Sequence, residues 1–431
     1  MADVKNPYGK NPGGGIAMPP YYKPTKYMTG SRSQYFPLTE TIGPDEMRVS
    51  FLGSTPFPPT KDQAGTCIMV ELGNGERFFF DFGSGCVRNI VAMQIAPALI
   101  NNVFITHLHV DHYADVPYIV PFRAWMGGYT PFHVTGPSGR TPELGTKAMC
   151  ENMMKMMKWH TDAFDVFPIG DGYKVEVNEF DWKDENGICY EKNGVTVRHW
   201  KRSHAKDGAS AYRLDWNGLS FVWTGDGRPD QLTAKYAKGC DVFVTELSGA
   251  DTSHLSELKY GLPAMIANYT LDTHHTHEYA AGYLIKQVNP RIGMITHIMF
   301  DEDMANEYYA GVRAHWDGLF CMGMDVTVVN VTKDAIWTRK AVLPSGSGMT
   351  PPMRELMAKA KMSGVQPPPT FTFPEPRLPR EAQQEQATRD LEIDQKLIYP
   401  PDVYREQVQT WPKHYTLDIA AMLGQKKPDA K

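Results

Sequence analysis

Four potential metal ligands follow one short apolar run in this chain of 431 residues. They are His107, His109, Asp111 and His112, within the sequence FITHLHVDH of residues 104–112. His107 and His109 alternate, so on an extended segment their side chains point to the same side and can bind one ion. Asp111 and His112 follow at the next turn, where they can hold a second ion about 3.5–4 Å away. The spacing predicts a dinuclear metal site of the kind that hydrolases use.

Three further candidate ligands, His204, Asp226 and His297, each follow a β-like run. Seven ligands are enough for two ions. Neutral imidazoles suit zinc or a similar borderline ion, and a carboxylate between two ions can bridge both and offset their charge. We therefore expect Asp226 to bridge two Zn²⁺ ions per chain, with Mn²⁺ or iron as alternatives.

The chain divides into three regions of different composition, and the middle one contains the elements that must position these ligands. Residues 1–45 are rich in Pro, Gly and Tyr, which predicts an arm that docks on a folded domain. Residues 46–340 alternate short β-like runs with helical stretches and contain two β-rich halves, which predicts a layered α/β sandwich of sheets. Residues 341–431 begin Pro-rich and continue with a probable helix, and we interpret them as a docked appendage or a dimer contact.

Composition narrows the class of protein. The chain is 42% hydrophobic and 22% charged, which is ordinary for a globular protein. Its net charge of −5 argues against a dominant electrostatic footprint for nucleic acid. Six cysteines without CxxC pairs suggest neither a disulfide framework nor a thiolate zinc site. We find no secretory signal and no apolar run long enough to span a membrane, so we expect a cytoplasmic protein unless an export signal has been removed.

A methionine-rich helical segment over residues 141–159 leaves two interpretations open. Its methionines are Met149, Met153, Met154, Met156 and Met157. Such a face often packs into a hydrophobic core. Adaptable methionine surfaces also line pockets for apolar ligands, so the segment could contribute to a substrate site.

These motifs together resemble the metallo-β-lactamase superfamily, in particular its branch of tRNase Z and related aryl sulfatases. The similarity covers about residues 47–300 and includes FLGSTP at 51–56, FFDFGSG at 79–85, ITHLHVDH at 105–112, TGDGRP at 224–229 and ITHI at 295–298. The resemblance implies an αββα sandwich with N- and C-terminal extensions. It also implies one zinc held by His107, His109 and His204, a second held by Asp111, His112 and His297, and Asp226 shared.

The resemblance further implies a histidine that donates a proton near the leaving group. The counterpart is His275, in the sequence HTHEYAAG, which lies 22 positions before His297. We assign His275, Asp111 and Glu246 to catalysis, with Glu246 orienting His275. His274 and His277 crowd this segment, so it could equally be a capped, solvated turn. Asp81 can either support a ligand or form a turn.

Three hypotheses remain for the activity. A tRNase Z-like endoribonuclease would need a basic arm to bind tRNA phosphates, and the chain after Pro137 carries the methionine-rich segment instead. We therefore expect a hydrolase that uses metal-bound hydroxide on a small aromatic or apolar substrate. That substrate could be an aryl sulfate, a phosphodiester, a carboxylic ester or lactone, or a displaceable aryl substituent. The alternatives are the tRNase Z-like endoribonuclease and a subunit or scaffold of a larger homo- or hetero-oligomer.

Overall fold

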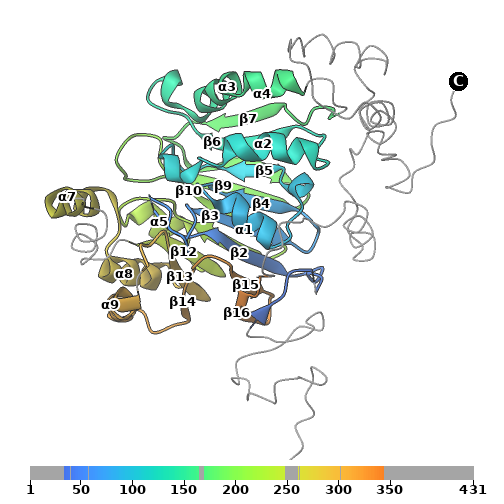
Figure 1. Cartoon of the computed structure of the whole chain (residues 1–431). Helices are drawn as coiled ribbons and strands as arrows, with labels where there is room; N and C mark the ends of the chain where they lie inside the picture. Colours follow the sequence, from blue (N-terminus) through green and yellow to red (C-terminus); the bar gives the residue numbers. More distant parts are fainter. Residues whose placement is uncertain are drawn as a thin grey trace, which may run out of the picture.

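The computed structural model describes residues 34–38, 40–56, 58–164, 169–247, 261, 263–300 and 302–343. Two stacked sheets form the centre of this part of the chain (Figure 1). In spatial order, the first sheet consists of β1 (Gln34–Tyr35), β16 (Ile336–Ala341), β15 (Thr327–Val331), β2 (Met47–Gly53), β3 (Cys67–Leu72), β4 (Arg77–Phe80), β5 (Asn102–Phe104), β6 (Phe132–Pro137) and β7 (Val175–Phe180). The second consists of β14 (Phe320–Met322), β13 (Ile292–Thr296), β12 (Val242–Glu246), β11 (Leu219–Trp223), β10 (Ser210–Trp216), β9 (Val195–Lys201) and β8 (Glu185–Lys192).

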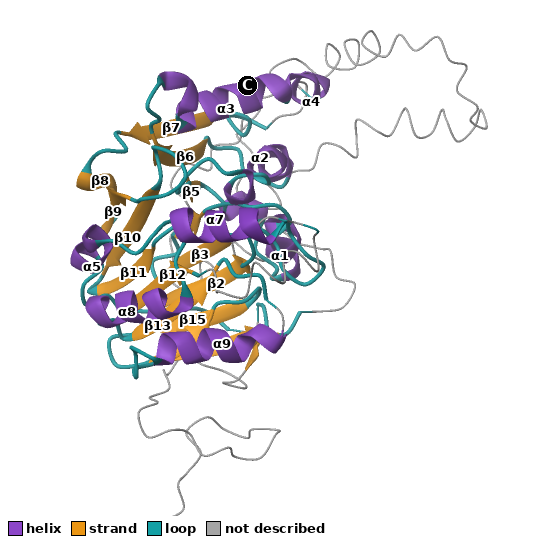
Figure 2. Cartoon of the chain, turned by 90° about the vertical axis from the view of Figure 1, so that its left-hand side faces the viewer, coloured by secondary structure: helices purple, strands orange, loops and turns teal. Residues whose placement is uncertain are grey.

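Helices cover the outer faces of both sheets. On the first sheet lie α1 (Cys86–Ala92), α2 (Val116–Trp125) and α3 (Thr146–Met156), and α4 (Lys158–Ala163) follows α3. On the second sheet lie α5 (Gln231–Tyr236), α8 (Glu278–Val288) and α9 (Glu302–Arg313). Figure 2 shows α5 and α8 on one side of the strands, α1 and α2 on the other, and α7 (Ala264–His274) in front. The described residues therefore form the predicted αββα sandwich.

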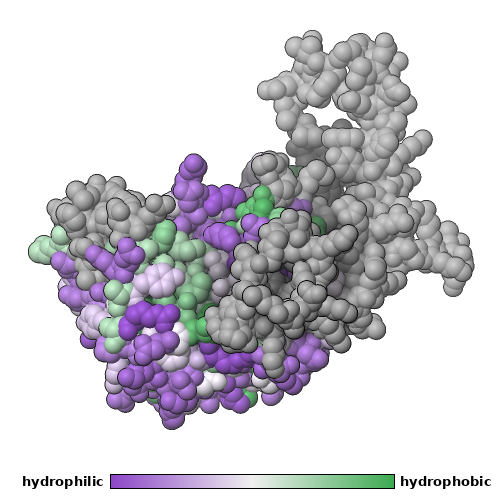
Figure 3. Space-filling model, turned by 90° about the horizontal axis from the view of Figure 1, so that it is seen from below, coloured by the Kyte–Doolittle hydropathy of each residue, from purple (hydrophilic) through white to green (hydrophobic). Residues whose placement is uncertain are grey.

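Alternating side chains explain why the strands are buried on both faces. In β3, Ile68 and Val70 point into the core between the sheets, whereas Cys67 and Met69 face the helices. The outward faces of α8 and α9 are more polar, and the face seen in Figure 3 is largely hydrophilic with a smaller hydrophobic area. No helix in the described part of the chain is long and apolar enough to cross a membrane.

The methionine-rich segment packs into the core. Met153 and Met157 are buried against the first sheet, and Met149 and Met154 pack partly against the same cluster. Met156 alone of the five is largely exposed, at 70%. The segment also divides into α3 and α4 instead of forming one helix. Of the two interpretations of this segment, core packing is the one that the structure supports.

Only parts of the two extensions are described. Of residues 1–45, β1 pairs in parallel with β16. Next to it, the Glu40 carboxylate accepts hydrogen bonds from Arg48 and Arg339, and all three side chains are buried. Of residues 341–431, only 341–343 are described, so the predicted C-terminal helix lies outside the described residues.

Candidate metal centre

The candidate ligands gather at one end of the sandwich. His107 and His109 follow β5, Asp226 follows β11, and His297 follows β13. Strands β4, β5 and β6 are parallel to one another, as are β11, β12 and β13, so within each sheet the loops after these strands meet at one edge. Ligands that are far apart in the sequence thereby converge.

The first ligand group contains His107, His109, His204 and Asp226, whose ligand atoms all lie within 4.8 Å of one another. His109 Nδ1 is 3.0 Å from His107 Nε2 and 3.1 Å from His204 Nε2. Asp226 Oδ2 is 3.8 Å from His107 Nε2 and 3.9 Å from His204 Nε2. Three imidazole nitrogens and one carboxylate oxygen form a donor set that suits a tetrahedral zinc ion.

The second ligand group contains Asp111, His112, Asp226 and His297. His112 Nε2 is 3.4 Å from Asp111 Oδ2 and 3.3 Å from Asp226 Oδ2. His297 Nε2 is 3.3 Å from each of the same two oxygens. Asp226 therefore belongs to both groups, in the position predicted for a bridge.

Unpartnered buried atoms fit bound metal ions. Within the described residues, His112 Nε2 and Asp226 Oδ1 are buried and have no hydrogen-bond partner. Buried polar atoms rarely stay unsatisfied in native proteins, because their desolvation then has no compensation. A cation between these atoms would satisfy both, so the residues present fit the two ions that the sequence predicts.

Surrounding groups orient the ligands. Asp81 is fully buried, and its Oδ2 lies 2.9 Å from His112 Nδ1, which turns His112 Nε2 toward the second group. Asp81 also accepts hydrogen bonds from the Thr106 backbone N–H and from Trp223 Nε1. His204 Nδ1 donates to the backbone oxygen of His274 at 2.8 Å, which directs its Nε2 to the first group. Such outer contacts fix the tautomer and orientation of metal-binding histidines.

The electrostatics favour neutral imidazoles in the first ligand group and an ionised Asp226. Burial lowers the pKa of His107 and His109, and it lowers the pKa of His204 to about 3. Burial tends to raise the pKa of Asp226, but His297 and His112 outweigh it and hold that pKa well below its usual value. In the second group, burial tends to lower the pKa of His112, but Asp226, Asp81 and Asp111 outweigh it and raise that pKa well above its usual value. Neutral imidazole and ionised carboxylate are the forms that bind metal.

Glu246, His275 and His297 form a third group of close ligand-type atoms. His275 Nδ1 lies 3.0 Å from Glu246 Oε1, which also accepts the Gly227 backbone N–H. Burial tends to lower the pKa of His275, but the Glu246 carboxylate outweighs it and raises this pKa to about 9. The His275 ring is 5.1 Å from that of His204, so it lies beside the first ligand group as well.

The neighbouring histidines have other contacts. His277 is the N-cap residue of α8, and its Nε2 lies 2.9 Å from Asp272 Oδ1. His275 lies between the end of α7 and this cap, and its side chain is mostly buried. The structure thus places His275 at the site and not in a solvated turn at the start of α8.

Some supporting residues were not apparent from the sequence. Thr106 binds Asp81 through its backbone and hydroxyl, and its hydroxyl also lies 3.1 Å from His107 Nδ1. Trp223 reaches Asp81 across the sandwich from β11. The sequence places Thr106 beside the ligand motif and Trp223 at the end of a strand, and these positions could have suggested a role at the site. The contact of Trp223 with Asp81, however, depends on how the two sheets stack.

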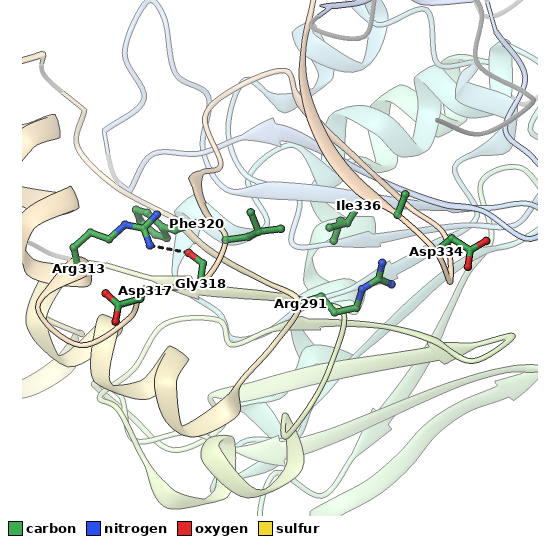
Figure 4. Close-up of a pocket in the computed structure, with 9 residues that line it drawn as sticks. Arg291, Arg313, Asp317, Gly318, Phe320, Asp334 and Ile336 are labelled. Carbon is green, nitrogen blue, oxygen red and sulfur yellow. Dashed lines mark hydrogen bonds between the residues drawn. The ribbon is translucent and has the colours of Figure 1, made fainter. Parts of the chain in front are cut away.

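A surface pocket of about 550 Å³ lies away from these groups. Arg291 precedes β13 and lines this pocket, whereas His297 follows the same strand, so the pocket is at the opposite end of the sheet (Figure 4). Arg291 donates hydrogen bonds to Asp241 and to the Thr332 backbone oxygen, and Arg313 donates to the Gly318 backbone oxygen. These arginines are already paired, and the pocket is not the candidate reaction site.

Comparisons with other proteins find relatives of this chain. A sequence model of the family described as Anti-Pycsar protein Apyc1 matches residues 47–283. A Ribonuclease Z from Methanocaldococcus jannaschii is 33% identical over 247 residues, covering 48% of this chain and 75% of the relative. A Ribonuclease Z from Methanococcus maripaludis is 38% identical over 92 residues, covering 21% of this chain and only 30% of the relative. The metallo-β-lactamase fold protein YhfI from Bacillus subtilis aligns with a TM-score of 0.49 and 14% identity, over 68% of this chain and 100% of that chain.

Two stacked sheets with outer helices, and clustered His and Asp ligands at one end, define a metallo-β-lactamase-fold protein. The chain belongs to the family described as Anti-Pycsar protein Apyc1, in the tRNase Z branch of the metallo-β-lactamase superfamily. The predicted fold class and superfamily are therefore confirmed. The relatives named Ribonuclease Z bear out the predicted enzyme class, a metal-dependent hydrolase.

Proposed function

We propose that this chain is a two-metal phosphodiesterase that cleaves RNA, in the manner of a tRNase Z-like endoribonuclease. The observation that carries the proposal is the pair of ligand groups that share Asp226, with His275 and Glu246 beside them. Relatives named Ribonuclease Z match up to 48% of the chain, which supports RNA as the substrate to test first.

The sequence favoured a small aromatic or apolar ester, and that preference loses one of its two supports. It rested on the lack of a basic arm and on the methionine-rich segment as the lining of an apolar site. Met153 and Met157 instead pack in the core beneath α3 and α4, so they are not available to line the reaction site. The endoribonuclease alternative becomes the better supported function.

The residues of this chain divide the chemical work. Two bound ions would lower the pKa of a shared water and polarise the oxygen of the bond that is attacked. Asp226 would offset the charge of both ions, and Asp81 and the His274 carbonyl keep His112 and His204 in the orientation that binds metal. Glu246 accepts a hydrogen bond from the Nδ1–H of His275, which leaves Nε2 to carry the proton that the departing oxygen requires.

The metal, the location and the assembly stay predictions. Zinc is our proposal because three imidazoles and a carboxylate suit it, with manganese or iron as alternatives. A cytoplasmic location and a homo- or hetero-oligomer also stay proposals. We also propose the roles that the sequence assigned to the site residues. The metal ligands are His107, His109, Asp111, His112, His204, Asp226 and His297, and the residues assigned to catalysis are His275, Asp111 and Glu246.

A direct comparison of substrates tests the function. We would incubate the metal-loaded full chain with a precursor tRNA and with chromogenic aryl sulfates, phosphodiesters and carboxylic esters. We expect the highest kcat/KM for the RNA, and His109→Ala should abolish cleavage by removing a ligand of the first group. Higher efficiency on the small esters than on RNA would overturn the proposal. Absence of both bound metal and hydrolysis would favour the scaffold hypothesis.

A further inference from the structure

A series of aromatic rings leads outward from the metal centre. The ring of His204, in the first ligand group, is 5.8 Å from the ring of His274. The His274 ring is 5.9 Å from the Tyr269 ring, in an edge-to-face arrangement. His274 is partly buried and Tyr269 is 65% exposed, so the series runs from the ligands to the surface.

The surface around Tyr269 is unusually apolar for an exposed helix. In α7, only Ala267 and Leu271 are buried. Met265 is 80% exposed and Ile266 is 48% exposed. These two side chains lie four and three residues before Tyr269, so all three share one region of the helix surface. Of these three side chains, Tyr269 alone carries an aromatic ring that can stack on a nucleobase.

The neighbouring ligand loop presents a cation to solvent. Lys206 is exposed and lies two residues after His204. The same loop is joined to the Asp226 loop, because the Arg228 backbone N–H donates to the Ser203 oxygen at 2.9 Å. The partly buried His274 ring thus lies beside the ligand His204, the exposed Tyr269 ring lies beside His274, and the exposed cation Lys206 is in the His204 loop. Stacking rings together with cations are the means by which proteins bind single-stranded nucleic acid.

We propose that the Tyr269 ring, supported edge-to-face by His274, forms a stacking platform for a nucleobase next to the scissile phosphodiester, with Lys206 attracting a neighbouring phosphate. The inference rests on the proposed function and specifies how the site would recognise its substrate. It predicts a single-stranded segment at the cleavage position, because a paired base has no free face for the Tyr269 ring.

Substitutions on α7 test the platform. We would compare Tyr269→Ala and Tyr269→Phe with Met265→Ala, a matched control that shortens an exposed side chain on the same helix without removing a ring. The substrates are two precursor RNAs, one intact and one with an abasic residue beside the mapped cleavage position. We expect Tyr269→Ala to lower kcat/KM on the intact RNA by about 5- to 150-fold and to abolish the preference for it. Tyr269→Phe and Met265→Ala should keep that preference.

A binding measurement separates this inference from the proposed function. Fluorescence anisotropy with a labelled single-stranded oligouridylate needs no catalysis. Weaker binding by Tyr269→Ala, with normal binding by Met265→Ala, supports the platform even if no RNA is cleaved. Equal binding by wild type and Tyr269→Ala overturns it. Equal weakening by Tyr269→Ala and Met265→Ala, together with a change in oligomeric state, also overturns it and identifies α7 as a protein contact.

Discussion

The two ligand groups share Asp226 but differ in their surroundings. The first group includes His109, which is exposed, and its outer support is the neutral carbonyl oxygen of His274. The second includes His112 and His297, which are buried, and its outer support is the Asp81 carboxylate. A buried site with more negative charge holds a cation more firmly. We therefore expect the ion of the second group to be retained longer and that of the first to exchange with solvent.

The largest effect should follow from removal of the residue that the two groups share. Asp226→Ala should lower the affinity for both ions, and hydrolysis should fall by more than about 100-fold, because loss of an outer support alone costs about 10- to 100-fold. Metal content by mass spectrometry and kcat on the preferred substrate measure both effects. Two retained ions with near-normal turnover would show that Asp226 is not the bridge.

The second-largest effect should be on the rate of hydrolysis alone, with both ligand groups still holding their ions. His275→Ala should retain two ions and slow hydrolysis by about 10²- to 10⁴-fold, because the departing oxygen loses its proton donor. The loss should be greatest for substrates with poor leaving groups. A series of phosphodiesters with leaving groups of different pKa measures this trend. A uniform loss across the series, or no loss, would transfer the acid role to another residue such as His277.

Substitution of a residue that is not itself a metal ligand should lower the metal affinity of the two ligand groups to different extents. Asp81→Asn should weaken the ion of the second group by about 10- to 100-fold, because His112 loses the carboxylate that orients it. The first group is linked to Asp81 less directly, through the Thr106 hydroxyl that lies between Asp81 and His107, so its ion should be weakened less. Metal titration followed by calorimetry resolves the two affinities. Equal weakening of both would contradict the assignment of Asp81 to one group.

The smallest effect concerns acid stability away from the ligands. His199 is buried against Phe180, and burial lowers its pKa to about 4. Its contribution to stability is therefore complete above the unfolded-state pKa of about 6.5 and is lost as the pH falls toward 4, by about 3 kcal/mol at most. Urea unfolding of His199→Gln should show a correspondingly flatter decline between pH 7 and 4. Identical declines in wild type and variant would mean that His199 does not titrate as described.

The sequence was most informative where ligands lie close together in the chain. His107, His109, Asp111 and His112 were recognisable from spacing alone, and His204, Asp226 and His297 from their positions after β-like runs. Their convergence follows from the parallel order of the strands that carry them. Local pattern supplied the seven candidate ligands, and the family resemblance implied how they divide into two groups.

Contacts that depend on long-range packing could not be predicted from the sequence. The contact of Trp223 with Asp81 joins the two sheets, and no local pattern indicates it. The role of the methionine-rich segment depended on which face of α3 meets the sheet, and that too is set by tertiary packing. No sequence pattern indicates a role for Tyr269, because that role depends on its contact in space with His274, which in turn lies beside His204.

Anomalous diffraction from crystals of the metal-loaded full chain would test the central claim, that two ions share Asp226, most directly. We expect two peaks about 3.5–4 Å apart, one beside His107, His109 and His204, the other beside Asp111, His112 and His297, with the Asp226 carboxylate contacting both. A single peak, or two peaks of which only one contacts Asp226, would contradict the account.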